Sequence, residues 1–192
     1  MQQTKRLLDI LLSLTALVVL SPALLFIAIR TLISSSGAII YAQERVGQHG
    51  VPFVIYKFRS MYPDAEKDGP ALSCDGDPRI TPWGKIMRKW KLDELPQLWN
   101  ILIGNMSLVG PRPERQYYID QLIQVAPQYP ELLKVKPGLT SLGMVQFGYA
   151  SSVPDMAARM RYDLEYLDRL SLGLDISIML QTLRIILSGK GK

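Results

Sequence analysis

The sequence has few of the residues that bind metals through sulfur or imidazole. Among its 192 residues there is one cysteine, Cys74, and one histidine, His49. A single cysteine excludes an internal disulfide, and this pair cannot supply the four ligands of a structural zinc site. We therefore interpret Cys74 as a free loop thiol or a small packing residue, which is compatible with a reducing compartment.

The chain also lacks the glycine-rich loops that commonly bind nucleotide phosphates. Neither of the two common spacings of such a loop occurs, and the pattern of alternating strands and helices that supports them is missing. Internal repeats and low-complexity tracts are absent as well. A phosphate-bearing ligand must therefore be held by a different arrangement of residues.

Acidic residues are fewer than basic residues in this sequence. There are 22 Lys and Arg against 17 Asp and Glu, which gives a formal net charge of +5 at pH 7. This balance suits an anionic partner, such as phospholipid headgroups, nucleotide phosphates or nucleic acid, and charge alone does not choose among them. The length suits one domain with its own core.

A long apolar run covers residues 7–29. As one straight helix it would extend ~35 Å, which exceeds a bilayer core of ~30 Å. Ser21 and Pro22 interrupt it, and a proline there removes a helical hydrogen bond and kinks the helix. Basic residues flank both ends, namely Lys5, Arg6 and Arg30. We predict a retained, re-entrant membrane anchor over residues 1–35 with both ends on the cytoplasmic side, because the run is too long for a signal peptide.

The remaining residues, 36–192, are predicted to form a compact domain. Residues 38–43 and 52–58 flank a glycine-containing turn and predict a β-hairpin, and residues 69–82 form a polar loop. Helices are expected at residues 84–92, after Pro96, and at 114–125, 156–170 and 174–187. The fold class is therefore α+β and mostly helical. The segment 174–187 is apolar on nearly all sides, which is typical of an interfacial helix or of one docked on the anchor.

Two adjacent carboxylates, Asp93 and Glu94, are the first candidate site residues. Neighbours on a helix point in different directions, so one carboxylate can attack a substrate while the other binds a cation such as Mg²⁺. The alternative is that the pair caps the helix after Pro96, with Gln97 completing a capping box. Basic residues before and after the pair favour the first interpretation; they are Arg88, Lys89, Lys91 and Arg112.

Arg112 lies between Pro111 and Pro113, whose rings restrict the backbone and present the guanidinium with little ordering cost. Such a fork is suited to phosphate, although a rigid turn with an exposed arginine would give the same pattern. Asp75 and Asp77 form an Asp-x-Asp pair, which can hold a metal on a nucleotide sugar. No strand precedes them, so a solvated turn is favoured.

Four segments together resemble a known family. They are residues 57–61 (KFRSM), 92–98 (LDELPQL), 104–113 (GNMSLVGPRP) and 136–140 (KPGLT). The chain is similar over essentially its whole length to the bacterial sugar transferases, the small monotopic polyprenyl-phosphate phosphoglycosyl transferases. The resemblance implies transfer of a sugar-1-phosphate from a UDP-sugar to undecaprenyl phosphate, with release of UMP. It also implies Mg²⁺ as cofactor, a covalent aspartyl intermediate, and a role in starting exopolysaccharide, lipopolysaccharide, capsule or glycoprotein glycan assembly.

The resemblance assigns roles to individual positions. Asp93 matches the attacking carboxylate, and Glu94 the carboxylate that holds magnesium. Positions that match substrate-binding residues are Lys57, Arg59, Arg88, Arg112 and Asp163.

One segment departs from the family pattern. Many members have an arginine after a glycine in this region, whereas here residues 145–149 are Val, Gln, Phe, Gly and Tyr. The missing arginine leaves the identity of the sugar open.

The partners expected from this interpretation are a UDP-sugar, undecaprenyl phosphate and membrane phospholipid at the cytoplasmic face of a bacterial inner membrane, and no nucleic acid. A homo-oligomer is compatible with the sequence. Two alternatives stay open. One is a non-catalytic basic membrane scaffold or nucleic-acid binder, and the other is a UDP-releasing glycosyl transferase that uses Asp75 and Asp77.

Overall fold

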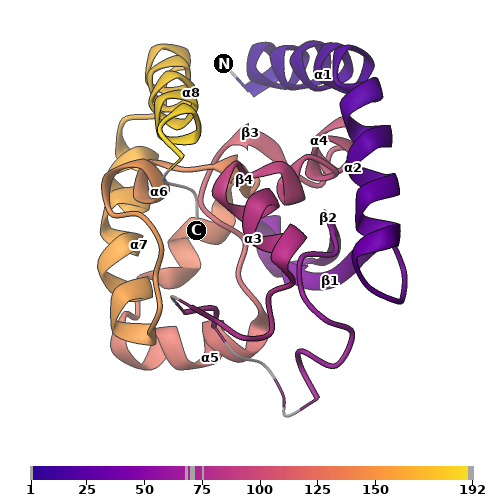
Figure 1. The fold of residues 1–192 in the computed structure, drawn as a ribbon. Helices are drawn as coiled ribbons and strands as arrows, with labels where there is room; N and C mark the ends of the chain where they lie inside the picture. The colour runs from indigo at the N-terminus through magenta and orange to yellow at the C-terminus, as the bar shows by residue number, and fades with distance from the viewer. Residues whose placement is uncertain (1, 68, 70–71, 75, 190–192) are drawn as a thin grey trace.

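The computed structural model describes residues 2–67, 69, 72–74 and 76–189 (Figure 1). Its α-helices are α1 (Gln2–Val19), α2 (Ser21–Ser34), α3 (Pro82–Lys89), α4 (Gln97–Ile103), α5 (Gln116–Val125), α6 (Leu142–Gln146), α7 (Val153–Asp168) and α8 (Leu172–Leu187). The 3-10 helices are η1 (Gln48–Gly50), η2 (Leu92–Glu94) and η3 (Tyr129–Lys134). The strands are β1 (Ile40–Val46), β2 (Pro52–Phe58), β3 (Ser107–Val109) and β4 (Gly138–Thr140). The described chain is therefore mostly helical with little sheet, as the α+β prediction stated.

The break between α1 and α2 lies at the predicted Ser-Pro step. The two helices meet at 64°. Pro22 has no N–H to offer to the carbonyl one turn earlier, and the hydroxyl of Ser21 donates instead to the Val18 carbonyl at 2.8 Å. The serine thus satisfies the acceptor that the proline leaves free. Within the described part of the chain no individual helix could cross a membrane, although this bent pair has the length and composition to do so.

The first turns of α1 are attached to the rest of the protein by charged side chains. Lys5 forms an ion pair with Asp175 of α8 at 2.6 Å, and Arg6 donates to the carbonyl of Leu102 at 2.8 Å. Asp9 is buried, and its Oδ1 accepts from the Leu108 backbone N–H at 3.0 Å. The polar residues of α1 therefore face the folded domain, which leaves leucines and valines on its outer side.

Strands β1 and β2 form the predicted antiparallel hairpin, with Ile40 opposite Phe58 and Val46 opposite Pro52. A second sheet, in which β3 and β4 pair in parallel, was not predicted from the sequence. Gly110 and Gly138 allow this pairing, because a Cβ on either residue would collide with the backbone of the other segment. The close approach holds the chain just before Pro111 and Arg112.

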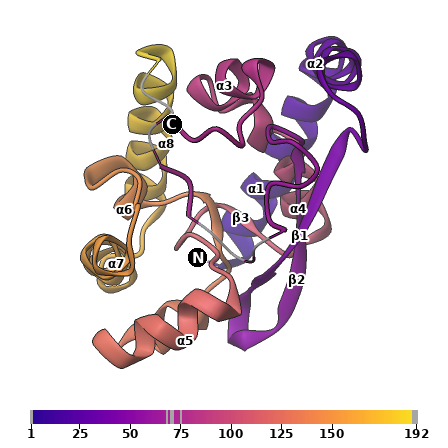
Figure 2. The same ribbon diagram turned by 60° about the horizontal axis from the view of Figure 1, so that its bottom comes forward.

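The predicted helix at 84–92 is too long. Helix α3 ends at Lys89, and Lys91 has a positive φ of 57°, which turns the chain sharply before η2 begins. The helix predicted at 156–170 is α7, and its Met156 and Met160 pack in a core with Tyr118 and Leu122 of α5. Figure 2 shows α7 and α8 on one side of β3 and the β1–β2 hairpin on the other. The apolar side chains exposed on α8 are Ile176, Leu180, Leu183 and Leu187.

Candidate active site

A cavity of about 500 Å³ lies between the hairpin and the helices of the second half of the chain. Its walls come from β1, β2, α3, η2, the residues that follow β3, and the loops after β2 and α6. This volume is within the range of small-molecule sites. The cavity contains Asp93 and Glu94, so the candidate dyad is in the wall of a space that could hold a substrate.

The short helix η2 brings the dyad into the cavity. Lys91, with its left-handed backbone, reverses the chain after α3, and η2 then presents Asp93 and Glu94 before Pro96 starts the next helical segment. Both carboxylates are buried, at 5% and 6% exposure. Burial of two adjacent acids requires compensating charge, because an isolated carboxylate in an apolar environment is strongly unfavourable.

Glu94 receives that compensation from three cations. Its Oε1 lies 2.7 Å from Lys57 Nζ and 3.5 Å from Arg112 Nη2, and its Oε2 lies 3.7 Å from Lys91 Nζ. Burial alone would raise the pKa of Glu94, but the charges of Lys57, Lys91 and Arg112 outweigh it and hold the pKa well below its usual range. Glu94 is therefore ionised throughout the physiological pH range.

Asp93 has the opposite environment. Its Oδ1 is buried and has no hydrogen-bond partner among the residues that the structure describes. Burial raises the pKa of Asp93, and the charge of Glu94 raises it further. A pair of titratable groups whose pKa values are driven apart is typical of a division of chemical roles. Asp93 is thus the carboxylate with a free oxygen, while Glu94 is fixed in a cluster of cations.

Arg112 follows Gly110, at the point where the chain after β3 approaches Gly138 closely. Its guanidinium contacts Glu94 and also donates to Met144 Sδ at 3.5 Å. Burial lowers the pKa of Arg112, but the neighbouring Glu94 reverses this and raises it, so its positive charge is secure. The predicted guanidinium clamp therefore points into the cavity beside the dyad.

Arg88 of α3 also lines the cavity, where its Nε donates to Ser60 Oγ at 2.9 Å and its Nη1 to Ser73 Oγ at 2.8 Å. Together with Lys57, which reaches the dyad from β2, it completes the group of predicted basic residues around the two acids. The structure brings Lys57, Arg88 and Arg112 to one site although they lie far apart in the sequence.

Arg59 has a different position from its neighbour Lys57. It is 7% exposed, and its guanidinium donates to the carbonyl of Ala38 beyond α2 and, at the end of α2, to the carbonyls of Ser35 at 2.6 Å and Thr31 at 3.2 Å. These are the carbonyls that a helix leaves unpaired at its C-terminus. Although Arg59 lines the cavity wall, its terminal nitrogens bind backbone carbonyls at and beyond the end of α2 rather than the dyad.

Asp163 does not line the cavity. It is 2% exposed in α7, and its Oδ1 accepts from the backbone N–H of Gly143 at 2.8 Å. Burial raises the pKa of Asp163 to about 6. The structure therefore places this residue behind the site, where it fixes the start of α6, and Arg159 of the same helix lines the cavity instead.

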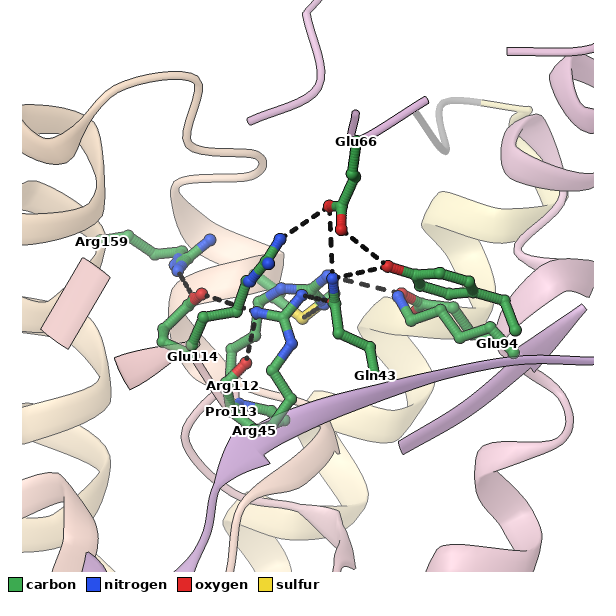
Figure 3. A network of polar contacts seen from close by, with 12 residues as sticks. Gln43, Arg45, Glu66, Glu94, Arg112, Pro113, Glu114 and Arg159 are labelled. Atoms are coloured by element: carbon green, nitrogen blue, oxygen red, sulfur yellow. Dashed lines mark hydrogen bonds and ion pairs between the residues drawn. The ribbon is translucent and has the colours of Figure 1, made fainter. Parts of the chain in front are cut away.

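A further polar network in the cavity wall, drawn together with Glu94 and Arg112 in Figure 3, was not predicted from the sequence. Arg45 donates to Gln43 Oε1 at 2.6 Å and lies 3.3 Å from Glu114 Oε2, while Arg159 lies 2.5 Å from Glu114 Oε1. In the same region Arg115 forms an ion pair with Glu66 at 2.7 Å. The signal was present in the alternation of polar residues on β1, because residues 43 and 45 face the same side of a strand.

The Asp-x-Asp alternative has little support. Asp77 is 2% exposed, does not line the cavity, and is paired with Arg79 at 2.7 Å. The hydrogen bonds from Arg79 lower the pKa of Asp77. Asp75 lies outside the described residues. Asp77, the member of the motif that lies within the described residues, is therefore engaged in a local ion pair with Arg79.

The dyad offers suitable donors for Mg²⁺, which needs only one or two protein carboxylates when substrate phosphates supply the other ligands. The described residues contain no group of three or more His, Cys, Asp or Glu that could hold a metal by itself. Asp93 and Glu94 both line the cavity, and their carboxylates carry hard oxygen donors. The residues present thus fit Mg²⁺ in the company of phosphate.

Comparison with known proteins places this site in context. The model of a family described as bacterial sugar transferase matches residues 1–189. A UDP-N-acetylgalactosamine-undecaprenyl-phosphate N-acetylgalactosaminephosphotransferase of Aeromonas hydrophila is 41% identical over 187 residues, which are 97% of this chain and 44% of the relative. A UDP-glucose:undecaprenyl-phosphate glucose-1-phosphate transferase of Escherichia coli K12 is 38% identical, over 93% of this chain and 39% of the relative.

A shorter relative matches from end to end. The exopolysaccharide production protein PSS of Rhizobium leguminosarum is 37% identical over 97% of both chains. This chain spans less than half of the length of the Aeromonas and Escherichia relatives. Because the family model covers almost all of the sequence and several relatives exceed 30% identity over nearly its full length, the chain belongs to the bacterial sugar transferase family.

Proposed function

We propose that this protein transfers a sugar-1-phosphate from a UDP-sugar to undecaprenyl phosphate and releases UMP. The observation that carries the proposal is the contrast within the dyad. Asp93 has a buried oxygen without a partner among the described residues, and the adjacent Glu94 lies among three cations that suit a diphosphate. Relatives named as undecaprenyl-phosphate sugar-phosphate transferases support the same substrate class.

In the first step a carboxylate oxygen of Asp93 attacks the phosphorus that bears the sugar. A new O–P bond forms to Asp93, the bond from that phosphorus to the bridging oxygen breaks, and UMP leaves with the electron pair. Lys57, Lys91 and Arg112, which surround the adjacent Glu94, would offset the negative charge that develops on the phosphates, which is the main way in which proteins assist phosphoryl transfer.

In the second step a phosphate oxygen of undecaprenyl phosphate attacks the same phosphorus. The bond to Asp93 breaks and the carboxylate is regenerated, while the product carries the sugar through a diphosphate. Two displacements through a covalent aspartyl-phosphosugar make the kinetics ping-pong.

Mg²⁺ bound by Glu94 would neutralise part of the diphosphate charge and favour its approach to an anionic nucleophile. In this role Glu94 must stay ionised, which agrees with the direction of its pKa. Arg88 and Arg112 bind phosphate oxygens as guanidinium forks, and Lys57 holds Glu94 in position.

We further propose that the protein lies at the cytoplasmic face of a bacterial inner membrane, anchored by the bent pair α1 and α2 as a re-entrant hairpin and contacting phospholipid with α8. The bend of 64° at Ser21 and Pro22 and the exposed leucines and valines on the outer side of α1 support this arrangement. The product would start the assembly of a surface polysaccharide or glycoconjugate.

A product assay tests the proposal. Detergent-solubilised protein is mixed with Mg²⁺, undecaprenyl phosphate and a panel of UDP-sugars, and nucleotide products are separated. We expect UMP, and intact-protein mass spectrometry with donor alone should show one added sugar phosphate that Asp93→Asn lacks. Release of UDP would contradict the proposal and favour an ordinary glycosyl transferase, and near-normal turnover by Asp93→Asn would exclude the covalent step.

A further inference from the structure

Tyr149 lies in the wall of the cavity without a structural role that its packing explains. It follows α6 in the loop that leads to α7, it is half-buried, and its side chain lines the cavity. It belongs to none of the hydrophobic core clusters of the described residues. The ring therefore lies at the cavity surface and is not part of the core.

The ring does contact two cations of the site. Lys91 Nζ lies 4.0 Å from the ring centroid, and Arg112 Cζ lies 5.9 Å from it. A cation over an aromatic face is attracted by the ring electrons, and this orients the ring in the wall. The same two cations contact Glu94, the residue assigned above to the metal and diphosphate. Tyr149 is thus held directly beside the groups that receive the phosphates.

A UDP-sugar carries a planar uracil on one side of its diphosphate and a hydroxyl-rich sugar on the other. The cavity has two matching kinds of wall. Tyr149 offers an aromatic face beside the phosphate-binding cations, whereas the network of Gln43, Glu66 and Arg115 offers an amide, a carboxylate and a guanidinium that suit hydroxyl groups. Stacking on an aromatic ring is the usual way in which proteins bind a base without reading its edges.

We propose that Tyr149 is the platform on which the uracil ring of the donor stacks, an inference that rests on the proposed function of the site. The sugar then extends toward Glu66 and Arg115. Tyr149 consequently sets affinity for the nucleotide and contributes equally to every UDP-sugar, whereas sugar selectivity belongs to Gln43, Glu66 and Arg115.

The experiment measures UMP binding to the full chain in detergent with Mg²⁺ by titration calorimetry, because UMP has the base and a phosphate but no sugar. Tyr149→Leu should weaken UMP binding by about tenfold, the factor that corresponds to a stacking loss of about 1.4 kcal/mol. Tyr149→Phe keeps the ring and should bind UMP as the unmodified protein does. Tyr117→Leu is the matched control, because Tyr117 is exposed on α5 and does not line the cavity.

KM values for UDP-glucose and UDP-N-acetylgalactosamine give a second measurement, and Tyr149→Leu should raise both by the same factor. Unchanged UMP affinity in Tyr149→Leu would overturn the inference. So would a change in KM for one sugar only, which would place the ring against the sugar, or a change confined to undecaprenyl phosphate, which would place it against the lipid.

A third variant, Tyr149→Trp, provides a fluorescence measurement that does not depend on whether Tyr149→Leu folds correctly. Tyr149→Trp retains an aromatic face, and added UMP should quench its fluorescence beyond any change in the unmodified protein; absence of additional quenching would count against stacking. These binding measurements do not depend on turnover. Failure of the wild type to release UMP would overturn the proposed function, whereas loss of the Tyr149 effect with UMP release intact would overturn only this inference.

Discussion

Lys57 and Glu94 form a buried ion pair that joins the hairpin to the helix carrying the dyad. Lys57 Nζ on β2 lies 2.7 Å from Glu94 Oε1 on η2, although the residues are 37 positions apart. Burial lowers the pKa of Lys57, and the charge of Glu94 acts in the opposite direction. Lys57 makes the shortest of the three ion pairs of Glu94, so its removal takes away part of the compensation of this buried charge and leaves Lys91 and Arg112 in place.

Replacing Lys57 with Met should therefore destabilise the protein by about 1 to 3 kcal/mol, the usual cost when a buried polar group loses one of its partners. The double variant with Glu94→Gln should recover part of this loss, because the two residues share one interaction. Urea unfolding in detergent measures both. Lys134→Met is the control, since Lys134 pairs with Glu131 in an exposed pair whose loss should have little effect. Equal stabilities for the Lys57 and Lys134 variants would contradict the prediction.

Arg112 and Arg59 should respond differently to the same substitution. Arg112→Lys should lower turnover by about tenfold or more with little change in stability, because lysine lacks the guanidinium fork. Arg59→Lys should instead lower the melting temperature, since one ammonium cannot replace the hydrogen bonds to the carbonyls at the end of α2, and its donor KM should stay unchanged. Steady-state kinetics and thermal melts separate the two. The assignment fails if Arg59→Lys raises the donor KM while the protein remains as stable as before.

We expect the dependence of turnover on Mg²⁺ to require the carboxylate of Glu94. Chelation should abolish turnover, and added Mg²⁺ should restore it, because the diphosphate must be partly neutralised before an aspartate can attack. Glu94→Gln should lose most activity and require more Mg²⁺ for half-maximal turnover. A titration of Mg²⁺ against initial rate checks both. Full activity of Glu94→Gln at ordinary Mg²⁺ concentrations would show that this carboxylate does not hold the metal.

Asp163 should give a stability signature between pH 4 and pH 7. Its pKa in the folded protein is raised to about 6 by burial, so the protonated form is favoured on folding. That contribution is fully present below the ordinary pKa of 3.8 and is lost as pH rises through about 6. Asp163→Asn keeps an acceptor for Gly143 and cannot ionise, so its melting temperature should rise relative to the unmodified protein over this interval.

The control for this pH prediction is Asp155, an exposed residue in the first turn of α7. Hydrogen bonds from Ser152 and Ser151 lower its pKa, so its contribution is present above the ordinary pKa and is lost as pH falls. The stability difference between Asp155→Asn and the unmodified protein should therefore stay nearly constant between pH 4 and pH 7, whereas that of Asp163→Asn should grow over the same interval. Parallel pH profiles for the two variants would refute the assigned environment of Asp163.

The bend at Pro22 makes a prediction about topology. Pro22→Ala restores the missing backbone N–H, so α1 and α2 can join into a straight helix long enough to span a bilayer. Single cysteines at positions 3 and 36, in a Cys74→Ser background, can be probed with a membrane-impermeant thiol reagent in intact cells. Both should be protected in the unmodified anchor, and position 3 should become labelled with Pro22→Ala. Labelling of position 3 without that substitution would rule out the hairpin.

Local sequence was sufficient for the features that depend on neighbouring residues. The break at Ser21 and Pro22 follows from a missing N–H, and the β1–β2 hairpin follows from alternating apolar residues on either side of a turn. The Asp93 and Glu94 pair and the guanidinium between two prolines were also identified from short motifs. The end of α3 was placed too late, because the left-handed conformation of Lys91 has no signal in its residue type.

Tertiary structure decided what each charge contacts. The sequence by itself determined the helical character of the chain, the bent apolar segment and the acidic pair with its basic surroundings. Only the folded chain shows that Lys57 contacts Glu94 whereas Arg59 contacts the end of α2. It also decides that Asp163 lies outside the cavity wall and that Tyr149 lies against Lys91. The physical reason is that the energy of a charge depends on its burial and on partners that are distant in sequence, and the order of residues does not specify either.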